Sequence, residues 1–147
     1  MTRVVVGWVG LVGYGIAAVI ALFFPIYGGR GATVLVDAVL GFFERVTAPL
    51  GLGIVGVEML ANVLVFVPIG VFAAMILPRA GWWIAVIGGA VLSMSAELFQ
   101  DAVLSSRVGS VRDVILNIAG TFIGAFGTWV VRRIAAARAV DRSDAPH

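Results

Sequence analysis

The sequence contains no cysteine, and its only histidine is the last residue, His147. The absence of cysteine excludes disulfide bonds, thiol catalysis and thiolate metal sites. A single histidine at the very end of the chain argues against a histidine-based metal site and against a Ser/His nucleophile. We therefore expect neither a metal ion nor another cofactor.

Charge is also scarce. Only 12% of the 147 residues are charged, all ten basic residues are arginine, and the formal net charge is +2. A typical soluble domain carries about 25% charged residues. The small net charge, and the absence of a basic patch with interleaved aromatic residues, argue against a nucleic-acid partner.

What the sequence does contain is long apolar runs. Hydrophobic residues make up 61% of the chain, and the mean hydropathy is +1.10. These values indicate an integral membrane protein with one small helical bundle and no second domain. We predict an all-α fold with four transmembrane helices, at about 4–24, 54–77, 82–104 and 111–131.

The first apolar run has two interpretations. A helix over 4–24 rises about 31 Å, which is enough to cross the hydrocarbon layer. The alternative is a cleaved signal peptide, but the run is longer than a normal signal core and no clean small-x-small cleavage site follows it. We therefore favour a retained helix.

A shorter amphipathic segment follows at 33–46. Asp37, Gly41, Glu44 and Arg45 lie toward one face of a helix there, and apolar residues cover the remainder. This pattern favours a helix at the membrane surface, and a re-entrant segment is the main alternative.

Arginine positions predict the orientation in the membrane. Four spans place both termini on one side, together with six arginines, whereas the other side carries four: Arg30, Arg45, Arg107 and Arg112. The positive-inside rule then puts both termini in the cytoplasm. We predict one transmembrane domain over 1–139 and a flexible cytoplasmic tail over 140–147.

Polar residues gather on three of the predicted helices, all in the outer half of the membrane. They recur at spacings of three or four residues, which places them on one face of each helix. A carboxylate that faces lipid costs several kcal/mol, so we expect these groups to meet inside the bundle. They are Glu58 and Asn62, then Ser93, Glu97, Gln100 and Asp101, then Asp113 and Asn117, with Arg107 and Arg112 at the connecting loop.

Less specific roles remain open for several of these residues. Asn62 and Asn117 serve equally well as hydrogen-bonding contacts between helices. Asp101 fits a solvated helix end, and Arg112 fits an interfacial anchor. Gly120-x-x-x-Gly124 is more typical of helix packing than of ligand contact. Glu97 and Asp113 remain the strongest candidates for a functional role.

The order and spacing of these motifs resemble the VanZ-like family. The resemblance rests on Asn62 with Phe66-Val-Pro-Ile-Gly70, on Ser93-x-x-x-Glu97-x-x-Gln100, on Arg107, and on Asp113-x-x-x-Asn117-x-x-Gly120. It covers about residues 58–124. It implies a small multi-pass protein of the bacterial cell membrane.

The family's name-giving member is associated with resistance to teicoplanin, a glycopeptide with an acyl chain that acts on lipid-linked cell-wall precursors. The resemblance therefore implies a polar outer-leaflet pocket for a lipid headgroup, a lipid-linked envelope precursor or a lipoglycopeptide, and a contribution to antibiotic resistance. Arg107 would meet phosphate or carboxylate, because guanidinium forks suit those anions. The expected ligand-binding residues are Glu58, Asn62, Ser93, Glu97, Gln100, Arg107, Asp113 and Asn117.

Other classes of function stay open. An intramembrane enzyme acting on a lipid-linked substrate would use Glu97 and Asp113 as acid and base, with Arg107 stabilising developing charge. A transporter ranks lower, because the inner halves offer little polarity beyond Thr121 and Thr128. A purely structural role for the polar groups, and a homo-oligomer joined through small-residue stripes, are further alternatives.

Overall fold

The computed structural model describes residues 1–27, 53–103 and 110–143, together with Gly41, Arg45, Pro49 and Gly51. Only the backbone is described for 18–27, 100–103 and 140–143 and for Ile54. Most of the predicted amphipathic segment 33–46, and Arg107 with its neighbours in 104–109, lie outside the described residues. At Gly41 and Arg45 the backbone is helical.

The described part of the chain is helical and contains no strand, which confirms the all-α fold. A single 3-10 turn separates the second long helix from the third. The elements are α1 (Thr2–Tyr27), α3 (Ile54–Ile76), η2 (Arg79–Gly81), α4 (Trp82–Val103) and α5 (Val111–Ser143).

Three helices are long and apolar enough to cross a membrane. They cover Val55–Ile76, Arg79–Phe99 and Val111–Ala139, in agreement with three of the predicted spans. In the first helix, the side chains are described for Thr2–Ala17 only, an apolar stretch that is shorter than these three, so the count of four spans stays a prediction. The last helix continues beyond the predicted end at 131 and reaches Ser143.

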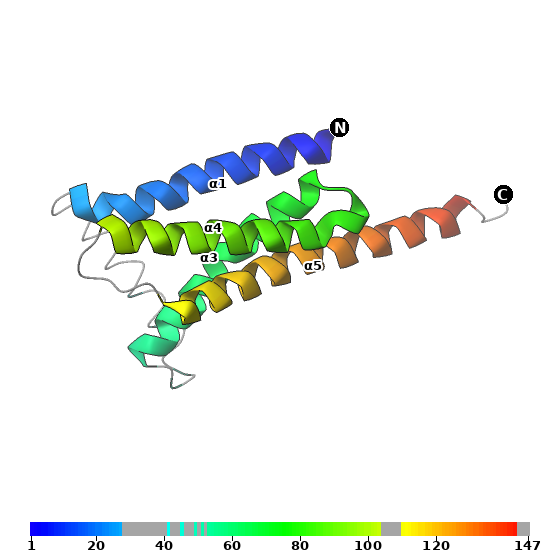
Figure 1. Cartoon of the computed structure of the whole chain (residues 1–147). Coiled ribbons are helices and arrows are strands. Elements are labelled where there is room, and N and C mark those ends of the chain that lie inside the picture. The colour runs from blue at the N-terminus through cyan, green and yellow to red at the C-terminus, as the bar shows by residue number, and fades with distance from the viewer. Residues whose placement is uncertain are drawn as a thin grey trace.

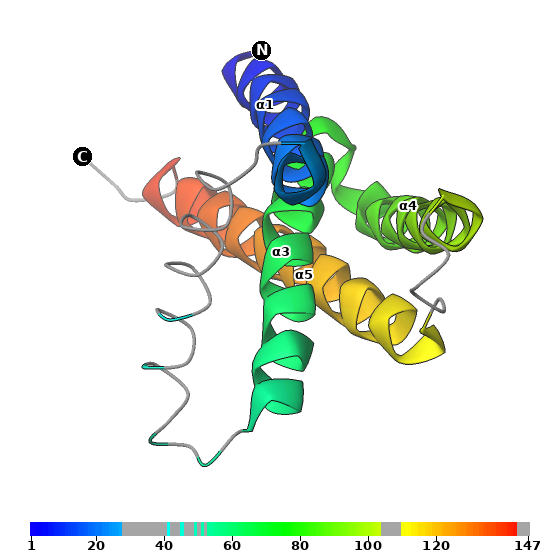
Figure 2. The ribbon, with the colours of Figure 1, turned by 90° about the vertical axis from the view of Figure 1, so that its left-hand side faces the viewer.

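The α3–α5 pair forms the central contact, and these two helices run in the same direction. α1 and α4 run in the opposite direction (Figure 1). α3 packs on α5, α1 packs on α3, and α4 packs on α5. Figure 1 shows that the N-terminus, η2 and the last turns of α5 lie at one end of the bundle, which we call the terminal end. The first turns of α3 and α5 and the last turns of α4 lie at the opposite end. Figure 2 shows α3 crossing α5 at the centre, with α1 and α4 on separate sides.

Glycines bring the backbones of α3 and α5 into direct contact. A Cβ atom added to Gly120 or Gly124 of α5 would collide with the carbonyl oxygens of Val63 and Val67, respectively, in α3. Gly70 in α3 meets the backbone of α5 in the same way. Such close approach favours dispersion contacts and weak Cα–H···O hydrogen bonds, which drive helix association where water is absent. Gly120 and Gly124 therefore pack helices, as their spacing predicts.

The contact between α1 and α3 also depends on small residues. Gly7 and Gly10 leave room for the Phe72 ring and its neighbours on α3. Further along, the Tyr14 hydroxyl donates a hydrogen bond of 3.0 Å to the carbonyl oxygen of Val65. This bond joins the two helices near the middle of the bundle.

Aromatic rings join α4 to α5 nearer the terminal end. The Trp82 ring meets Phe122 and Phe126 edge-on at centroid distances of 5.8 and 5.5 Å, and it lies 6.3 Å from Trp129. Edge-to-face arrangements of this kind stabilise a contact beyond the area that they bury. Toward the opposite end of the bundle, polar side chains replace aromatic rings in the contact between α4 and α5.

Candidate functional site

The predicted polar residues that the structure describes all lie near the opposite end of the bundle. Ser93 and Glu97 are one turn apart near the end of α4, and Asp113 and Asn117 are one turn apart near the start of α5. Val63 of α3 contacts Gly120 of α5 where the two helices cross, and their first turns diverge from that contact (Figure 2). The three helices therefore carry their polar groups toward the same end of the bundle, although those of α3 lie apart from those of α5.

A buried hydrogen bond joins α4 to α5 at the inner edge of this region. The Asn117 amide nitrogen Nδ2 donates to the Ser93 hydroxyl oxygen over 2.9 Å. Ser93 has no exposed surface and Asn117 is 8% exposed. One turn further along, the Thr121 hydroxyl donates to the carbonyl oxygen of Asn117 over 2.9 Å. Gly89 makes room for the fully buried Thr121, since a Cβ there would collide with the threonine side chain.

The oxygen atom of the Asn117 amide lacks a hydrogen-bond partner among the described residues. This atom, Oδ1, is buried. Turning the amide by 180° would exchange the two atoms and leave the nitrogen without a partner instead. A buried polar atom without a partner costs about 1–3 kcal/mol. Among the described residues, this buried region therefore retains one unused hydrogen-bonding position.

Glu97 links the end of α4 to the start of α5. Its carboxylate oxygen Oε2 accepts a hydrogen bond of 3.0 Å from the backbone nitrogen of Ser110. The carbonyl oxygen of Ser110 in turn accepts bonds from the backbone nitrogens of Asp113 and Val114 in the first turn of α5. A carboxylate at this position is stabilised by the partial positive charge of the helix N-terminus. Glu97 thus bonds Ser110 through its side chain, whereas Asp113 bonds Ser110 only through its backbone nitrogen.

The Asp113 carboxylate lies next to the Arg112 side chain. Its oxygen Oδ1 lies 3.7 Å from Nε of Arg112, and the two side chains are 25% and 48% exposed, respectively. Exposed ion pairs of this kind contribute little to stability. Asp113 also lies in the first turn of α5, where the helix dipole favours a negative charge.

The remaining predicted site residues are less constrained. Glu58 is exposed and Asn62 is half-buried, and within the described part of the chain neither side chain makes a hydrogen bond or ion pair. Gln100 and Asp101 belong to α4 by their backbone, but their side chains are outside the described set, as is Arg107. Among the described residues, no three histidine, cysteine or carboxylate groups come close enough to hold a metal ion.

Two residues of this region were not predicted as site residues. Ser110 contributes a backbone N–H, which no side-chain motif can indicate, although a serine before an apolar run is a usual helix-start signal. Thr121 follows Asn117 by four residues, so its place on the same helix face was visible in the sequence.

Comparison with known proteins gives one match. A family model described as VanZ/LLP1 matches residues 11–132, a range that includes α3, α4 and most of α5. Searches of curated proteins and of solved structures give no match.

Proposed function

The chain belongs to the VanZ/LLP1 family, and from this premise we propose that it is a membrane-embedded binding protein. The ligand is a lipid headgroup, a lipid-linked envelope precursor or a lipoglycopeptide of the teicoplanin type. It binds among the polar groups at the opposite end of the bundle, in the outer leaflet of a bacterial cell membrane. Binding there would contribute to antibiotic resistance by occupying the drug or its target.

The unsatisfied Asn117 oxygen is the observation that supports this proposal most directly. In the hydrocarbon layer no bulk water is present to satisfy it, and no described donor bonds to it, while the Ser93 hydroxyl already accepts from the amide nitrogen. A ligand hydroxyl or amide that donates to Oδ1 would remove the cost of the unpaired atom. Such groups are abundant on sugar and peptide headgroups.

Glu97 supports the proposal by holding the start of α5. Its carboxylate binds the Ser110 N–H, so Ser110 stays beside the polar faces of α4 and α5. Arg107 precedes Ser110 by three residues in the sequence, and we propose that it belongs to the same site. An arginine there suits a ligand phosphate or carboxylate.

Apolar surface beside the polar groups suits a ligand that carries an acyl chain. Leu98 on α4 and Val111 and Ile115 on α5 are large, apolar and exposed. On a membrane helix such side chains face lipid tails. A lipid-borne ligand would therefore place its headgroup at the polar residues and its chain along this surface.

The test compares Arg107→Ala and Glu97→Gln with the unsubstituted chain in cells and in purified form. We expect each variant to lose affinity for the ligand by about tenfold, as for one lost hydrogen bond to a charged group, and to lower teicoplanin tolerance. Ser95→Ala is the matched control, because the Ser95 hydroxyl is exposed and, among the described residues, bonds to the Val91 carbonyl of its own helix. Normal tolerance and normal lipid binding in both folded variants would overturn the proposal.

A catalytic role is the alternative, because the Glu97 carboxylate binds the Ser110 N–H just before the helical turn that carries Asp113. A pair of carboxylates in one site is suited to acid and base roles on a lipid-linked substrate. Incubating the purified protein with polyprenyl phosphates distinguishes the two functions. Turnover that is lost in Glu97→Gln and Asp113→Asn would replace binding by catalysis.

A further inference from the structure

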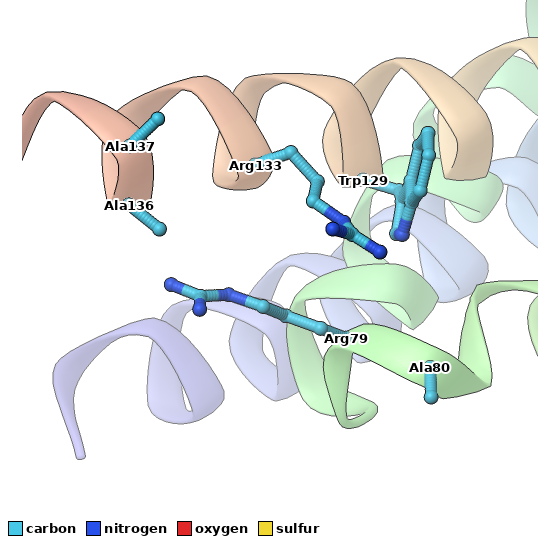
Figure 3. A pocket seen from close by; sticks show the side chains of 6 residues that line it. All are labelled: Arg79, Ala80, Trp129, Arg133, Ala136 and Ala137. Atoms are coloured by element: carbon cyan, nitrogen blue, oxygen red, sulfur yellow. The ribbon is translucent and has the colours of Figure 1, made fainter.

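A second group of charged residues lies at the terminal end of the bundle, far along the helices from the polar site. Two neighbouring cavities open there, of about 440 and 610 Å³. Arg79, Trp129 and Arg133 line the first (Figure 3). Arg3, Arg79 and Arg132 line the second. Arg79 therefore belongs to both.

The positions of these arginines are set by contacts within the chain. Arg132 donates from Nη1 to the carbonyl oxygens of Ala74 and Leu77, over 2.8 and 3.1 Å, at the end of α3. These carbonyl groups have no partner within their own helix, so Arg132 satisfies them. The Arg133 guanidinium lies over the Trp129 ring, 5.2 Å from its centroid. Such cation–π contacts orient a guanidinium without neutralising it.

Among the residues whose side chains the structure describes, none that lines either cavity is acidic. Besides the arginines and Trp129, the lining consists of alanines and Pro78. Figure 3 shows the Arg79 and Arg133 side chains extending into the same space between η2 and α5. Cations that share a cavity repel one another unless an anion lies between them, so an anionic group suits the arrangement that the described residues form.

The surroundings favour a lipid anion over a dissolved one. Arg79 begins one candidate membrane span, and Trp129, Arg132 and Arg133 lie near the end of another. Tryptophan and arginine at span ends mark the depth of the lipid headgroups. Basic pockets between transmembrane helices at this depth bind anionic headgroups.

We propose that the terminal end binds an anionic phospholipid that carries two phosphate groups, one in each cavity. Arg133 contacts the first phosphate and Arg3 with Arg132 contacts the second. Arg79, which lines both cavities, bridges the two. This site is separate from the polar site at the opposite end and does not depend on its function.

Native mass spectrometry of the purified full-length chain in detergent tests the proposal. The probes are cardiolipin, with two phosphates, phosphatidylglycerol, with one, and zwitterionic phosphatidylcholine. We expect affinity to fall in that order. Soluble pyrophosphate is the fourth probe, and we expect it not to displace cardiolipin at equal concentration, since it lacks acyl chains.

Single substitutions then locate the site. Arg133→Gln and Arg3→Gln should each lower cardiolipin affinity by about fivefold, the effect of one arginine near an anionic membrane surface, and each should remove the preference over phosphatidylglycerol. Arg79→Gln should lower it further, because that side chain serves both cavities. Arg138→Gln is the matched control: it removes the same charge from the same end of α5 but lines neither cavity, and should leave the affinity unchanged.

Three results would overturn the proposal. Equal affinity for cardiolipin and phosphatidylcholine would show that charge is not recognised. If Arg138→Gln weakened cardiolipin binding as much as Arg133→Gln, the overall positive charge of this end, and not the cavities, would account for the binding. Displacement of cardiolipin by pyrophosphate at equal concentration would make this a site for a soluble anion. Arg132 is left unsubstituted, because it also holds the end of α3.

Discussion

Ser93 and Ser95 lie two positions apart on α4, yet their hydroxyl groups have different surroundings. The Ser93 hydroxyl is fully buried and accepts the Asn117 amide of α5. The Ser95 hydroxyl is exposed and donates to the Val91 carbonyl of its own helix over 2.8 Å. The first therefore stabilises a tertiary contact and the second does not.

Ser93→Ala should accordingly destabilise the protein, because it leaves the whole Asn117 amide buried without a partner. We expect a loss of about 1–3 kcal/mol, measured by thermal unfolding of the detergent-solubilised chain. Ser95→Ala, the same change two residues away, should alter the unfolding temperature little. Equal effects of the two substitutions would contradict the role assigned to the Ser93–Asn117 bond.

Glu97 offers a second comparison at the scale of one residue. Glu97→Ala removes the acceptor of the Ser110 N–H, so amide hydrogen exchange at the start of α5 should become faster. Glu97→Gln keeps a neutral acceptor and should therefore increase the exchange rate less. Hydrogen–deuterium exchange of the peptide that contains Ser110 measures this. Glu58→Gln is the control, since Glu58 is exposed at the start of α3. Unchanged exchange in Glu97→Ala would show that the bond does not hold α5.

At the scale of helices, glycines decide which pairs can approach. α5 provides a direct comparison, because Gly124 faces the backbone of α3 while a Cβ at Gly127 would meet nothing within 4 Å. The two residues are three positions apart on α5, and only Gly124 lies against α3.

Gly124→Ala should therefore separate α3 from α5 and destabilise the bundle by about 1–3 kcal/mol, as overpacking usually does. Gly127→Ala should be neutral or stabilise it by up to about 1 kcal/mol, because alanine is the better helix former. Thermal unfolding in detergent measures both. A Gly124→Ala protein as stable as Gly127→Ala would mean that the close α3–α5 contact does not form.

At the scale of the whole molecule, the orientation of the bundle in the membrane can be tested, because different parts of the chain lie at its two ends. Thr2 and Ala80 lie at the terminal end and Val111 lies at the opposite end (Figure 1). Since the chain has no cysteine, single cysteine substitutions at these positions need no altered background.

We expect a membrane-impermeant maleimide to label Val111→Cys in intact cells. Thr2→Cys and Ala80→Cys should react only after the membrane is permeabilised, because the arginine distribution places both termini in the cytoplasm. The reverse pattern would place the polar site in the inner leaflet and overturn the proposed outer-leaflet ligand. It would leave the two-phosphate lipid site at the terminal end untouched.

The sequence by itself determined the class of the protein and the positions of its helices. Long apolar runs interrupted by Pro78 and by the polar segment near Ser110 set the bounds of α3, α4 and the start of α5, because backbone groups in lipid must bond within a helix. The three- and four-residue spacing of Ser93, Glu97, Asp113 and Asn117 also set their common faces and depth.

Only the tertiary structure decided which of these groups pair. Periodicity is a property of one helix, whereas a hydrogen bond between helices depends on their register and separation. That is why the Ser93–Asn117 bond and the unpaired Asn117 oxygen were not predictable. The same reason applies at the terminal end, where Arg3, Arg79 and Arg133 come from three elements and share adjoining cavities only once the bundle has packed.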